Sequence, residues 1–369
     1  MRVLFVSLIE DYWGGSEILW SKTAHALRPH HTVGAYFAYC KNNPPIQALK
    51  EDGVSLFYGT PIPTIWWKRI GRTGRRGLDA FRQTLAQFAP QLVVFSQGAL
   101  KEGTAEMAAC REAKVNYAII NQLVEPLYYD DRIWKSIRES ITRAKRIWFV
   151  SKENRSAVEA WLGSDLVNAV VINNATGEIA TPLPPWPDES CTWRLACVGR
   201  LYPKQKGQDL LIDVLGSEKW RDRPLEVTLY GAGERENLEA RIRYKQSRNI
   251  KFGGFVSALG DIWARHHALI MPSRYEGQSL AMLEAMLHER PVFVTPVGGT
   301  RGLVVDGVNG LVASHIDREG INDLLERAWE RRSEWRAFGQ SARRLAAACI
   351  DTNPGAAMAA RIETMMAKT

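Results

Sequence analysis

Short apolar runs alternate with longer amphipathic segments along most of the chain, and this alternation limits the possible folds more than any other feature. In the first half, amphipathic segments such as residues 17–27 and 132–144 predict helices. The predicted strands are Arg2–Ser7, Thr32–Ala38, Val54–Phe57, Gln91–Ser96, Tyr117–Ile120, Arg146–Val150 and Ala169–Ile172. Strand and helix in regular alternation predict a mostly parallel sheet with helices on both faces.

A proline-rich break separates this half from a second one with the same architecture. Residues 173–190 contain four prolines, which neither a helix interior nor a central strand accommodates, so we interpret them as an interdomain linker. Beyond the break, residues 208–215, 235–244 and 280–289 are predicted helices. The predicted strands are Arg194–Val198, Glu226–Tyr230, Ile250–Phe252, Ala268–Met271 and Val292–Thr295.

Two doubly wound, Rossmann-like α/β domains fit a length of 369 residues. We place the first domain at residues 1–180 and the second at residues 190–350. Ligands of open α/β sheets bind outside the carboxyl ends of the strands. A deep cleft between two such edges is therefore the expected ligand site.

Two carboxylates lie eight positions apart in the second half, Glu276 and Glu284. Glu276 follows Pro272-Ser273 in a glycine-containing turn, whereas Glu284 lies in an apolar run that predicts a helix. A turn that opens into a helix presents unpaired N–H groups and the positive end of the helix dipole, which suit a phosphate. Two acceptors for hydroxyl groups beside an anion cradle predict a pocket for a sugar nucleotide.

The segment after the first predicted strand contains Gly14-Gly15, which lets the backbone approach a ligand closely. Ser16 is predicted to cap the helix that follows. The segment does not match G-x-G-x-x-G, so no dinucleotide fingerprint is supported. A tight strand-to-helix turn without a ligand is the alternative interpretation.

Three further turns follow strands of the second half. Arg200 and Lys206 place two cations on one loop, which suits a diphosphate. Gly231 and Gly233 would line a nucleotide pocket, and the turn that ends in Val256 would offer its backbone to the edge of a base. For the two glycine-rich turns, a plain strand-end turn is the alternative interpretation.

The formal net charge of +8 fits anionic ligands. Part of it is local, because the segment Trp66–Arg76 carries five Lys and Arg residues beside a Trp pair. This segment is either a solvated helix face or a surface for a membrane or an acceptor. Nucleic acid is not favoured as a partner, because no recognised binding motif accompanies the segment.

The five cysteines are odd in number and form no C-x-x-C pair, which favours a reduced, cytoplasmic compartment. No signal-peptide pattern precedes the first predicted strand, and no uncharged apolar run approaches the roughly 20 residues that span a bilayer. Any membrane contact is therefore expected to be peripheral, at the inner face of the membrane.

In their order along the chain, these motifs resemble the retaining glycosyltransferases of family 4, the glycosyl transferases group 1 with the GT-B fold. The most specific piece is the E-x7-E element with Pro-Ser before it and Gly-Gly after it. The motifs are Gly14-Gly15, Gly199-Arg200, Lys206-Gly207, Gly231-Ala232-Gly233, Phe255-Val256, Pro272-Ser273, Glu276 to Glu284, Pro291, Gly298-Gly299, Asp306-Gly307 and Asn309-Gly310.

The resemblance implies transfer of a sugar from a UDP- or GDP-sugar to a glycan, lipid-linked or small-molecule acceptor. Glu276 would contact hydroxyls of the donor sugar, and Glu284 would hold the ribose. Arg200 and Lys206 would stabilise the departing diphosphate. No metal is expected, and the sequence has neither an Asp-x-Asp pair nor a His/Cys cluster with ligand spacing.

The resemblance also implies roles for backbone groups and for the end of the chain. The donor-binding positions would be Gly14, Gly15, Gly231, Gly233, Val256, Gly277, Gln278, Ser279 and Leu280. Residues 278–280 would cradle phosphate at the helix start. The helix at 354–369 would cross back and complete the first domain, with Pro354 at the crossing.

The chain departs from the family in the first domain, where many relatives carry a histidine near the donor sugar. Asn121 or Gln122 is the expected replacement, and Glu125 is a third candidate on the acceptor side. Gln278-Ser279 and Thr300-Arg301-Gly302 depart as well. Two alternatives stay open on the same fold: a sugar-nucleotide epimerase that uses acids such as Asp11, Glu17 and Glu125, and a non-catalytic binding protein.

Overall fold

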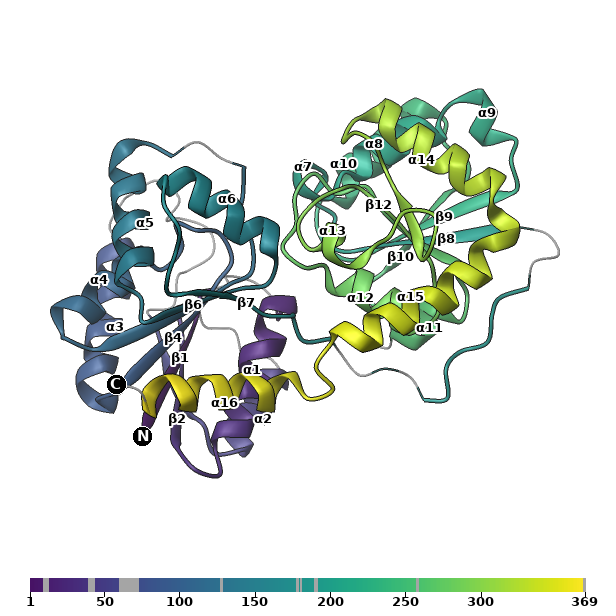
Figure 1. The fold of residues 1–369 in the computed structure, drawn as a ribbon. Helices are drawn as coiled ribbons and strands as arrows, with labels where there is room; N and C mark the ends of the chain where they lie inside the picture. Colours follow the sequence, from purple (N-terminus) through teal and green to yellow (C-terminus); the bar gives the residue numbers. More distant parts are fainter. Residues whose placement is uncertain are drawn as a thin grey trace. The chain divides into compact units, whose positions relative to one another are not determined.

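A computed structural model describes residues 1–8, 13–38, 44–59, 73–126, 129–176, 179, 181–188, 192–256 and 259–367. The chain forms two compact units (Figure 1). Unit 1 comprises Met1–Ala175 and Asp351–Thr369, and unit 2 comprises Thr176–Ile350. The change of unit after Ala175 falls within the predicted linker, whose described residues from 181 to 188 belong to unit 2.

Unit 1 contains a seven-stranded parallel sheet in the order β3-β2-β1-β4-β5-β6-β7. Its strands are β1 (Arg2–Ser7), β2 (Thr32–Phe37), β3 (Ser55–Tyr58), β4 (Leu92–Gln97), β5 (Asn116–Asn121), β6 (Arg146–Phe149) and β7 (Ala169–Val171). Each predicted strand of this half is confirmed to within one residue at either end. The parallel doubly wound architecture is confirmed as well.

Helices cover both faces of this sheet. The helices are α1 (Gly15–Leu27), α2 (Pro44–Glu51), α3 (Thr73–Phe88), α4 (Thr104–Glu112), α5 (Asp131–Arg143), α6 (Lys152–Leu162) and α16 (Pro354–Ala367). Successive residues of β1 point to opposite faces: Leu4 packs with residues of α3 to α6, and Phe5 packs with residues of α1, α2 and α16. Both faces are therefore buried, which explains why the strands are continuously apolar.

The last helix packs on the first. α16 lies along α1 in unit 1 (Figure 1). A side chain at Gly355 would meet the backbone oxygen of Lys22 at 2.6 Å, so the start of α16 approaches α1 closely. Met358 and Ile362 are buried in the same core cluster as Ala24 of α1.

Unit 2 contains a six-stranded parallel sheet in the order β10-β9-β8-β11-β12-β13. Its strands are β8 (Trp193–Val198), β9 (Leu225–Tyr230), β10 (Ile250–Gly254), β11 (Ala268–Met271), β12 (Val292–Val294) and β13 (Gly310–Val312). β10 continues two residues beyond its predicted end, because Gly254 pairs with Tyr230 after a shift in register. The sequence did not predict β13.

The helices of unit 2 are α7 (Pro203–Lys206), α8 (Gln208–Leu215), α9 (Glu218–Arg221), α10 (Arg235–Lys245), α11 (Leu259–Trp263), α12 (Leu280–Leu287), α13 (Thr300–Leu303), α14 (Arg318–Glu330) and α15 (Trp335–Cys349), with a 3₁₀ turn at Arg332–Glu334. α12 ends two residues before its predicted end, since His288 leaves helical geometry. Alternate residues of β8 again divide between two cores, Leu195 on one face and Ala196 on the other.

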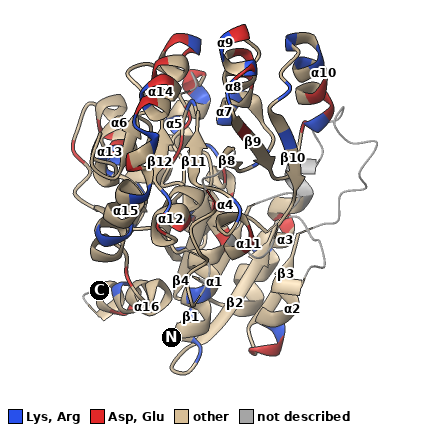
Figure 2. Ribbon diagram, turned by 90° about the vertical axis from the view of Figure 1, so that its right-hand side faces the viewer, with Lys and Arg blue, Asp and Glu red and all other residues tan. Residues whose placement is uncertain are grey.

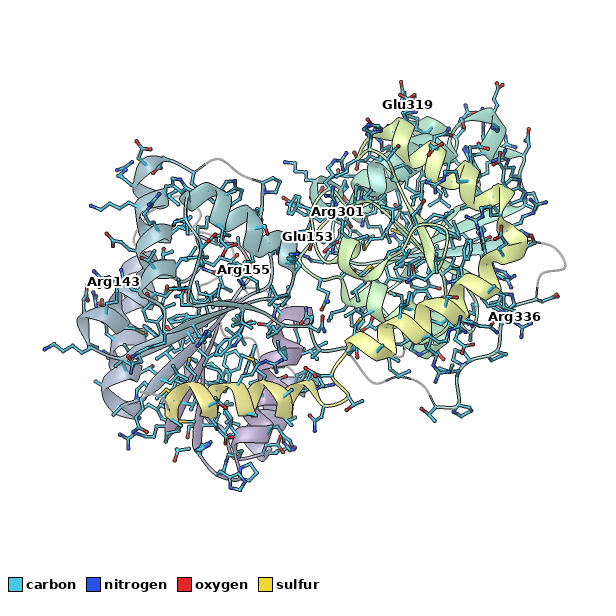
Figure 3. The ribbon with its side chains drawn as sticks, in the orientation of Figure 1. Arg143, Glu153, Arg155, Arg301, Glu319 and Arg336 are labelled. Carbon is cyan, nitrogen blue, oxygen red and sulfur yellow. The ribbon has the colours of Figure 1, made fainter. Side chains whose placement is uncertain are left out.

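Charged residues are concentrated on the helices, while the strands of both sheets are largely uncharged (Figure 2). Arg143 on α5, Glu319 on α14 and Arg336 on α15 illustrate this, because their exposed side chains extend from the outer helices (Figure 3). Within the described part of the chain, no helix combines the length and apolarity needed to cross a membrane.

Candidate functional site

The candidate site of unit 2 lies at the carboxyl edge of its sheet, where β8 and β11 are neighbours. The segment after β8 carries Arg200 in its loop and Lys206 at the end of α7, and the loop after β11 carries Glu276. The two loops pack tightly, because a side chain at Gly207 would meet the backbone oxygen of Pro272 at 1.9 Å. The φ of Gly207 is +67°, a second reason why glycine is required here.

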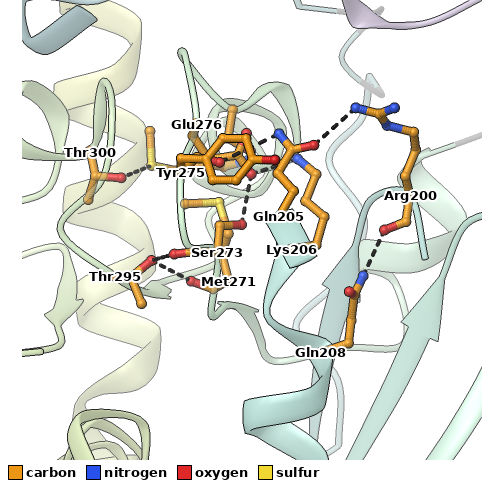
Figure 4. Close-up of polar contacts among 12 residues, drawn as sticks. Arg200, Gln205, Lys206, Gln208, Met271, Ser273, Tyr275, Glu276, Thr295 and Thr300 are labelled. Atoms are coloured by element: carbon orange, nitrogen blue, oxygen red, sulfur yellow. Dashed lines mark hydrogen bonds and ion pairs between the residues drawn. The ribbon is translucent and has the colours of Figure 1, made fainter. Parts of the chain in front are cut away.

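Lys206 and Glu276 form an ion pair, with 2.6 Å between Nζ and Oε1. Their side chains are 18% and 7% exposed. Ser273 donates a hydrogen bond to the same carboxylate oxygen at 2.7 Å, and Thr295 of the loop after β12 donates to the backbone oxygen of Ser273 at 2.6 Å (Figure 4). The carboxylate is thus held from two sides, and removing one charge of such a buried pair costs about 3–5 kcal/mol.

Arg200 lies in the loop between β8 and α7 and is exposed. It donates to Oε1 of Gln205 at 3.0 Å, while its backbone oxygen accepts from Nε2 of Gln208 at 2.7 Å (Figure 4). Arg200 and Lys206 therefore present two positive charges from one short segment, but the prediction that both lie on one loop is wrong, because Lys206 ends α7. One is exposed and the other is paired with an acid.

The turn after Glu276 leads directly into α12, as the sequence predicted. Ser279 caps the helix, and its side chain accepts from the backbone N–H of Met282 at 3.4 Å. Gly277, Gln278 and Leu280 flank this cap, so their backbone groups lie at the helix start. Glu284 lies in the second turn and is buried.

The Gly298-Gly299 pair packs against the turn between Glu276 and α12. A side chain at Gly298 would meet the backbone oxygen of Gly277 at 2.1 Å, and its φ is +51°. Gly299 donates a backbone hydrogen bond to the same oxygen at 2.6 Å. The glycine pair therefore fixes the peptide groups that follow Glu276.

Gly231 and Gly233 have a packing role in the structure. A side chain at Gly231 would meet the backbone oxygen of Gly199 at 2.0 Å, and one at Gly233 would meet that of Leu201 at 2.4 Å. The glycines let the loop after β9 lie against the loop that carries Arg200. Val256 follows β10 and packs against a core cluster of unit 2.

In unit 1, Gly14 and Gly15 form the start of α1. The prediction that Ser16 caps this helix is wrong: Gly14 is the N-cap without a side-chain cap, and Ser16 donates instead to the carboxyl group of Glu17. Glu17 is fully buried and also accepts from Ser7 at 3.1 Å and from Trp20 at 3.4 Å. Burial raises the pKa of Glu17 to about 7, against the lowering effect of these hydrogen bonds.

Asn121 ends β5 and is fully buried. Gln97, at the end of β4, donates through Nε2 to the backbone oxygens of Leu100 at 2.9 Å and Glu102 at 2.8 Å. Oε1 of Gln97 therefore accepts a hydrogen bond from Nδ2 of Asn121 at 3.1 Å. This polarity leaves Oδ1 of Asn121 buried with no hydrogen-bond partner among the described residues.

Gln122 shows the complementary pattern. Asn174 accepts through Oδ1 from the backbone N–H of Ala175 at 3.0 Å, so its Nδ2 donates to Oε1 of Gln122 at 3.0 Å. Nε2 of Gln122 is then buried without an acceptor in the described part of the chain. An uncharged acceptor and an uncharged donor on successive residues suit hydroxyl groups, which both donate and accept.

Glu125 lies three residues after Gln122 and is partly buried. Glu102 lies in the same region: burial raises the pKa of Glu102, backbone hydrogen bonds from Gly98 and Ala99 lower it, and the charge of Glu125 adds to the increase. This edge of unit 1 thus carries acids, amides and hydroxyls.

Other predicted positions lie outside the described residues. They are Asp11 and most of the segment Trp66–Arg76, whose last two arginines have no described side chains. Among the described residues, no group of three His, Cys, Asp or Glu side chains is arranged to hold a metal ion.

Three side chains near Glu276 were not assigned roles from the sequence: Ser273, Thr295 and Arg274. Ser273 belongs to the Pro-Ser motif directly before the turn that contains Glu276. This closeness in sequence could have predicted its contact with Glu276. Thr295 had no such signal, because its contact with Ser273 depends on β11 and β12 being neighbours.

Comparison with solved structures identifies the architecture. The chain is similar over 99% of its length to Anabaena HepE in complex with UDP-glucose, with a TM-score of 0.78, 18% identity and 99% of that chain covered. It is similar over its full length to the whole of sucrose-phosphate synthase from Thermosynechococcus elongatus, with a TM-score of 0.79 and 14% identity. The chain has the GT-B fold.

Part of the chain also matches a known sequence family. Residues 192–331 match the family described as Glycosyl transferases group 1. A glycosyltransferase of Methanocaldococcus jannaschii is 32% identical over 136 residues, which is 36% of each chain. The chain spans about a third of the length of the curated relatives it matches. These comparisons support an enzyme of the glycosyltransferase class and do not favour the epimerase.

Proposed function

We propose that the protein is a retaining, metal-independent glycosyltransferase of family 4 that transfers a sugar from a UDP- or GDP-sugar to a glycan, lipid-linked or small-molecule acceptor. The observation that carries the proposal is the partly buried Lys206–Glu276 pair, 2.6 Å apart, between Arg200 and the start of α12. Anabaena HepE, which shares the fold, was crystallised with UDP-glucose.

The first part of the proposed mechanism is an exchange of partners. A nucleotide-sugar diphosphate offers oxygens to Lys206, and its sugar offers hydroxyls to Glu276. The ion pair between these side chains is then replaced by two contacts with the donor. Arg200 and the N–H groups at the start of α12 add positive potential at the same place.

The second part concerns the transfer itself. The bond between the anomeric carbon and the phosphate oxygen breaks, and the acceptor oxygen forms its bond on the same face of the sugar. The acceptor proton passes to the departing phosphate oxygen. In this front-face route the protein supplies orientation and stabilises the leaving group, and no enzyme nucleophile is needed.

Three further assignments complete the proposal. Glu284 holds the ribose, and the backbone of Val256 meets the base. Asn121, Gln122 and Glu125 of unit 1 are the candidate contacts for the acceptor. The segment Trp66–Arg76 is the candidate contact for an anionic or lipid-linked acceptor and for a peripheral membrane surface, which sedimentation with anionic vesicles tests.

Metal independence has a direct test. Two cationic side chains and a helix start supply the charge that a metal would otherwise provide at the leaving group. Transfer measured with EDTA is therefore expected to match transfer with added Mg²⁺ or Mn²⁺. A requirement for either ion would remove this part of the proposal.

The main test is donor turnover by Glu276→Gln. A thermal-shift panel of nucleotide sugars first selects a donor, and release of the nucleotide then reports turnover. The variant is expected to lose roughly 10²-fold in kcat. Glu239→Gln is the matched control, because Glu239 pairs with Arg235 on the outer helix α10.

The outcomes separate the candidate functions. Undiminished transfer by Glu276→Gln contradicts the assigned sugar pocket. An epimerised sugar nucleotide formed without acceptor supports the epimerase, and absence of any nucleotide binding supports a binding protein. The anomeric configuration of the product, read by NMR, tests retention.

A further inference from the structure

Arg274 joins the two loops that bring Lys206 and Glu276 together. Its backbone N–H donates to the backbone oxygen of Gln205 at 2.7 Å. Its guanidinium donates to the backbone oxygen of Pro203 at 2.7 Å and to both carboxylate oxygens of Asp209, at 2.7 and 2.8 Å. One residue of the Glu276 loop therefore grips both α7 and the first turn of α8.

The acid in this contact is held in its charged form. Burial alone would raise the pKa of Asp209, but the hydrogen bonds and charge of Arg274 outweigh burial and lower it. Both side chains are partly buried, 31% exposed for Arg274 and 23% for Asp209. A bidentate, partly desolvated pair fixes orientation as well as distance.

Neither residue reaches the reacting groups in its described contacts. Asp209 starts α8 directly after Lys206-Gly207, and Arg274 lies two residues before Glu276. The Arg274–Asp209 pair therefore joins the chain segment that carries Lys206 to the chain segment that carries Glu276. Ser273 donates to the carboxylate and Thr295 donates to the backbone oxygen of Ser273, but these hydrogen bonds do not reach the segment that carries Lys206.

The geometry points to Arg274 and Asp209 as positioning residues that set the separation of Lys206 and Glu276, and so the place where donor diphosphate and sugar are received. This inference rests on the proposed function. It adds that the kcat of transfer depends on a contact that touches neither substrate. A shift of about 1 Å in a catalytic group, caused by a substitution far from the reacting atoms, can lower the rate by up to roughly 10²-fold.

A second pair on the same helix supplies the matched control. Arg241 of α10 binds both oxygens of Asp213, one turn after Asp209 on α8. That pair joins α8 and α10 and, among the described residues, makes no hydrogen bond to either loop. Arg241→Lys and Arg274→Lys each remove a bidentate fork and keep the charge.

The first experiment reads geometry without any substrate. The protein is acetylated with an N-hydroxysuccinimide ester, and mass spectrometry compares Lys206 with the exposed Lys204 of the same helix. Arg274→Lys and Asp209→Asn are expected to raise labelling of Lys206 relative to Lys204 severalfold, and Arg241→Lys is expected to leave the ratio unchanged. If Lys206 is labelled no more than in the wild type in both Arg274→Lys and Asp209→Asn, the inference is wrong.

The second experiment reads catalysis and uses a double-mutant cycle. Arg274→Lys is expected to lower kcat by roughly 10- to 100-fold with little change in the KM for the donor. In a Glu276→Gln background the same change is expected to cost less than about twofold, because the residue acts through Glu276. Thermal unfolding should show a comparable loss of stability for Arg274→Lys and Arg241→Lys.

The outcomes distinguish the two proposals. If Glu276→Gln transfers normally, the proposed function fails whatever the labelling shows. If Glu276→Gln is inactive while Arg274→Lys keeps the wild-type kcat, or lowers it equally in both backgrounds, only the positioning role fails.

Discussion

The carboxyl edges of the two sheets have the same architecture and different chemistry. In unit 2 the edge beside β8 and β11 carries cations, Arg200 and Lys206, with Glu276 in an ion pair. In unit 1 the edge beside β1, β4 and β5 carries amides, with an oxygen of Asn121 that has no hydrogen-bond partner among the described residues, and a buried acid, Glu17, whose pKa is raised to about 7. One edge is suited to a diphosphate and the other to neutral hydroxyl groups.

The comparison shows that a fold repeated within one chain does not dictate its chemistry. Each edge is defined by a few residues at strand ends, and these residues differ in charge between the units. Each prediction below changes one edge and asks whether the effect remains specific to it.

The largest effect is expected at the charged edge. Lys206→Met should reduce donor turnover by roughly 10²- to 10³-fold, because it removes a cation from the leaving group. It should also destabilise the fold by about 3–5 kcal/mol, since Glu276 stays buried without its partner. Kinetics and chemical denaturation measure the two losses.

The double variant Lys206→Met/Glu276→Gln separates these effects. It should recover most of the stability and none of the turnover, because no buried charge is then left unpaired. Recovery of turnover would show that the positive charge of Lys206 is not needed at this edge.

An intermediate effect is expected from the buried acid of unit 1. The pKa of Glu17 is about 7 in the folded protein and 4.5 when unperturbed, so the native state binds the extra proton between these values. Stability from this group is complete below pH 4.5 and is lost as the pH rises through 7. Glu17→Gln should therefore stabilise the protein at pH 8 by roughly 3 kcal/mol.

Thermal unfolding between pH 5 and pH 8 provides the measurement for Glu17. The wild type should lose stability relative to Glu17→Gln as the pH rises, whereas Glu51→Gln, an exposed acid on α2, should follow the wild type. Parallel curves for wild type and Glu17→Gln would mean that the buried carboxyl titrates at its ordinary value.

The smallest effect is expected at the amide pair. Asn121→Leu removes the oxygen that has no partner in the described part of the chain. The variant should raise the KM for the acceptor by about tenfold, which corresponds to the loss of one hydrogen bond to a neutral group. Hydrolysis of the donor in the absence of acceptor should change little. An unchanged KM would indicate that the oxygen of Asn121 meets only water, and the contrast between the two edges would then lose its functional meaning.

The sequence predicted the fold well because its strands are continuous apolar runs, buried on both faces. β13 was missed, since three residues from Gly310 to Val312 show no period of their own. Ser16 was assigned as a cap from residue type alone. Its hydroxyl instead donates to Glu17, which lies beside it in a buried turn.

The candidate site was predicted in part. The turn containing Glu276 and the helix containing Glu284 follow from local pattern, and the structure has both. The contact of Lys206 with Glu276 spans 70 residues and depends on β8 and β11 being neighbours, which no local pattern encodes. For the same reason the contact of Arg274 with Asp209 could not be predicted from local pattern.

The packing of α16 on α1 sets an order for biosynthesis. On the ribosome, the strands of unit 1 emerge well before the helix that covers Ala24 and its neighbours. That apolar face stays uncovered during translation of unit 2, until Met358 and Ile362 of α16 have been synthesised. A nascent chain therefore exposes this apolar surface for most of its synthesis, and such exposed surface favours aggregation before the last helix is made.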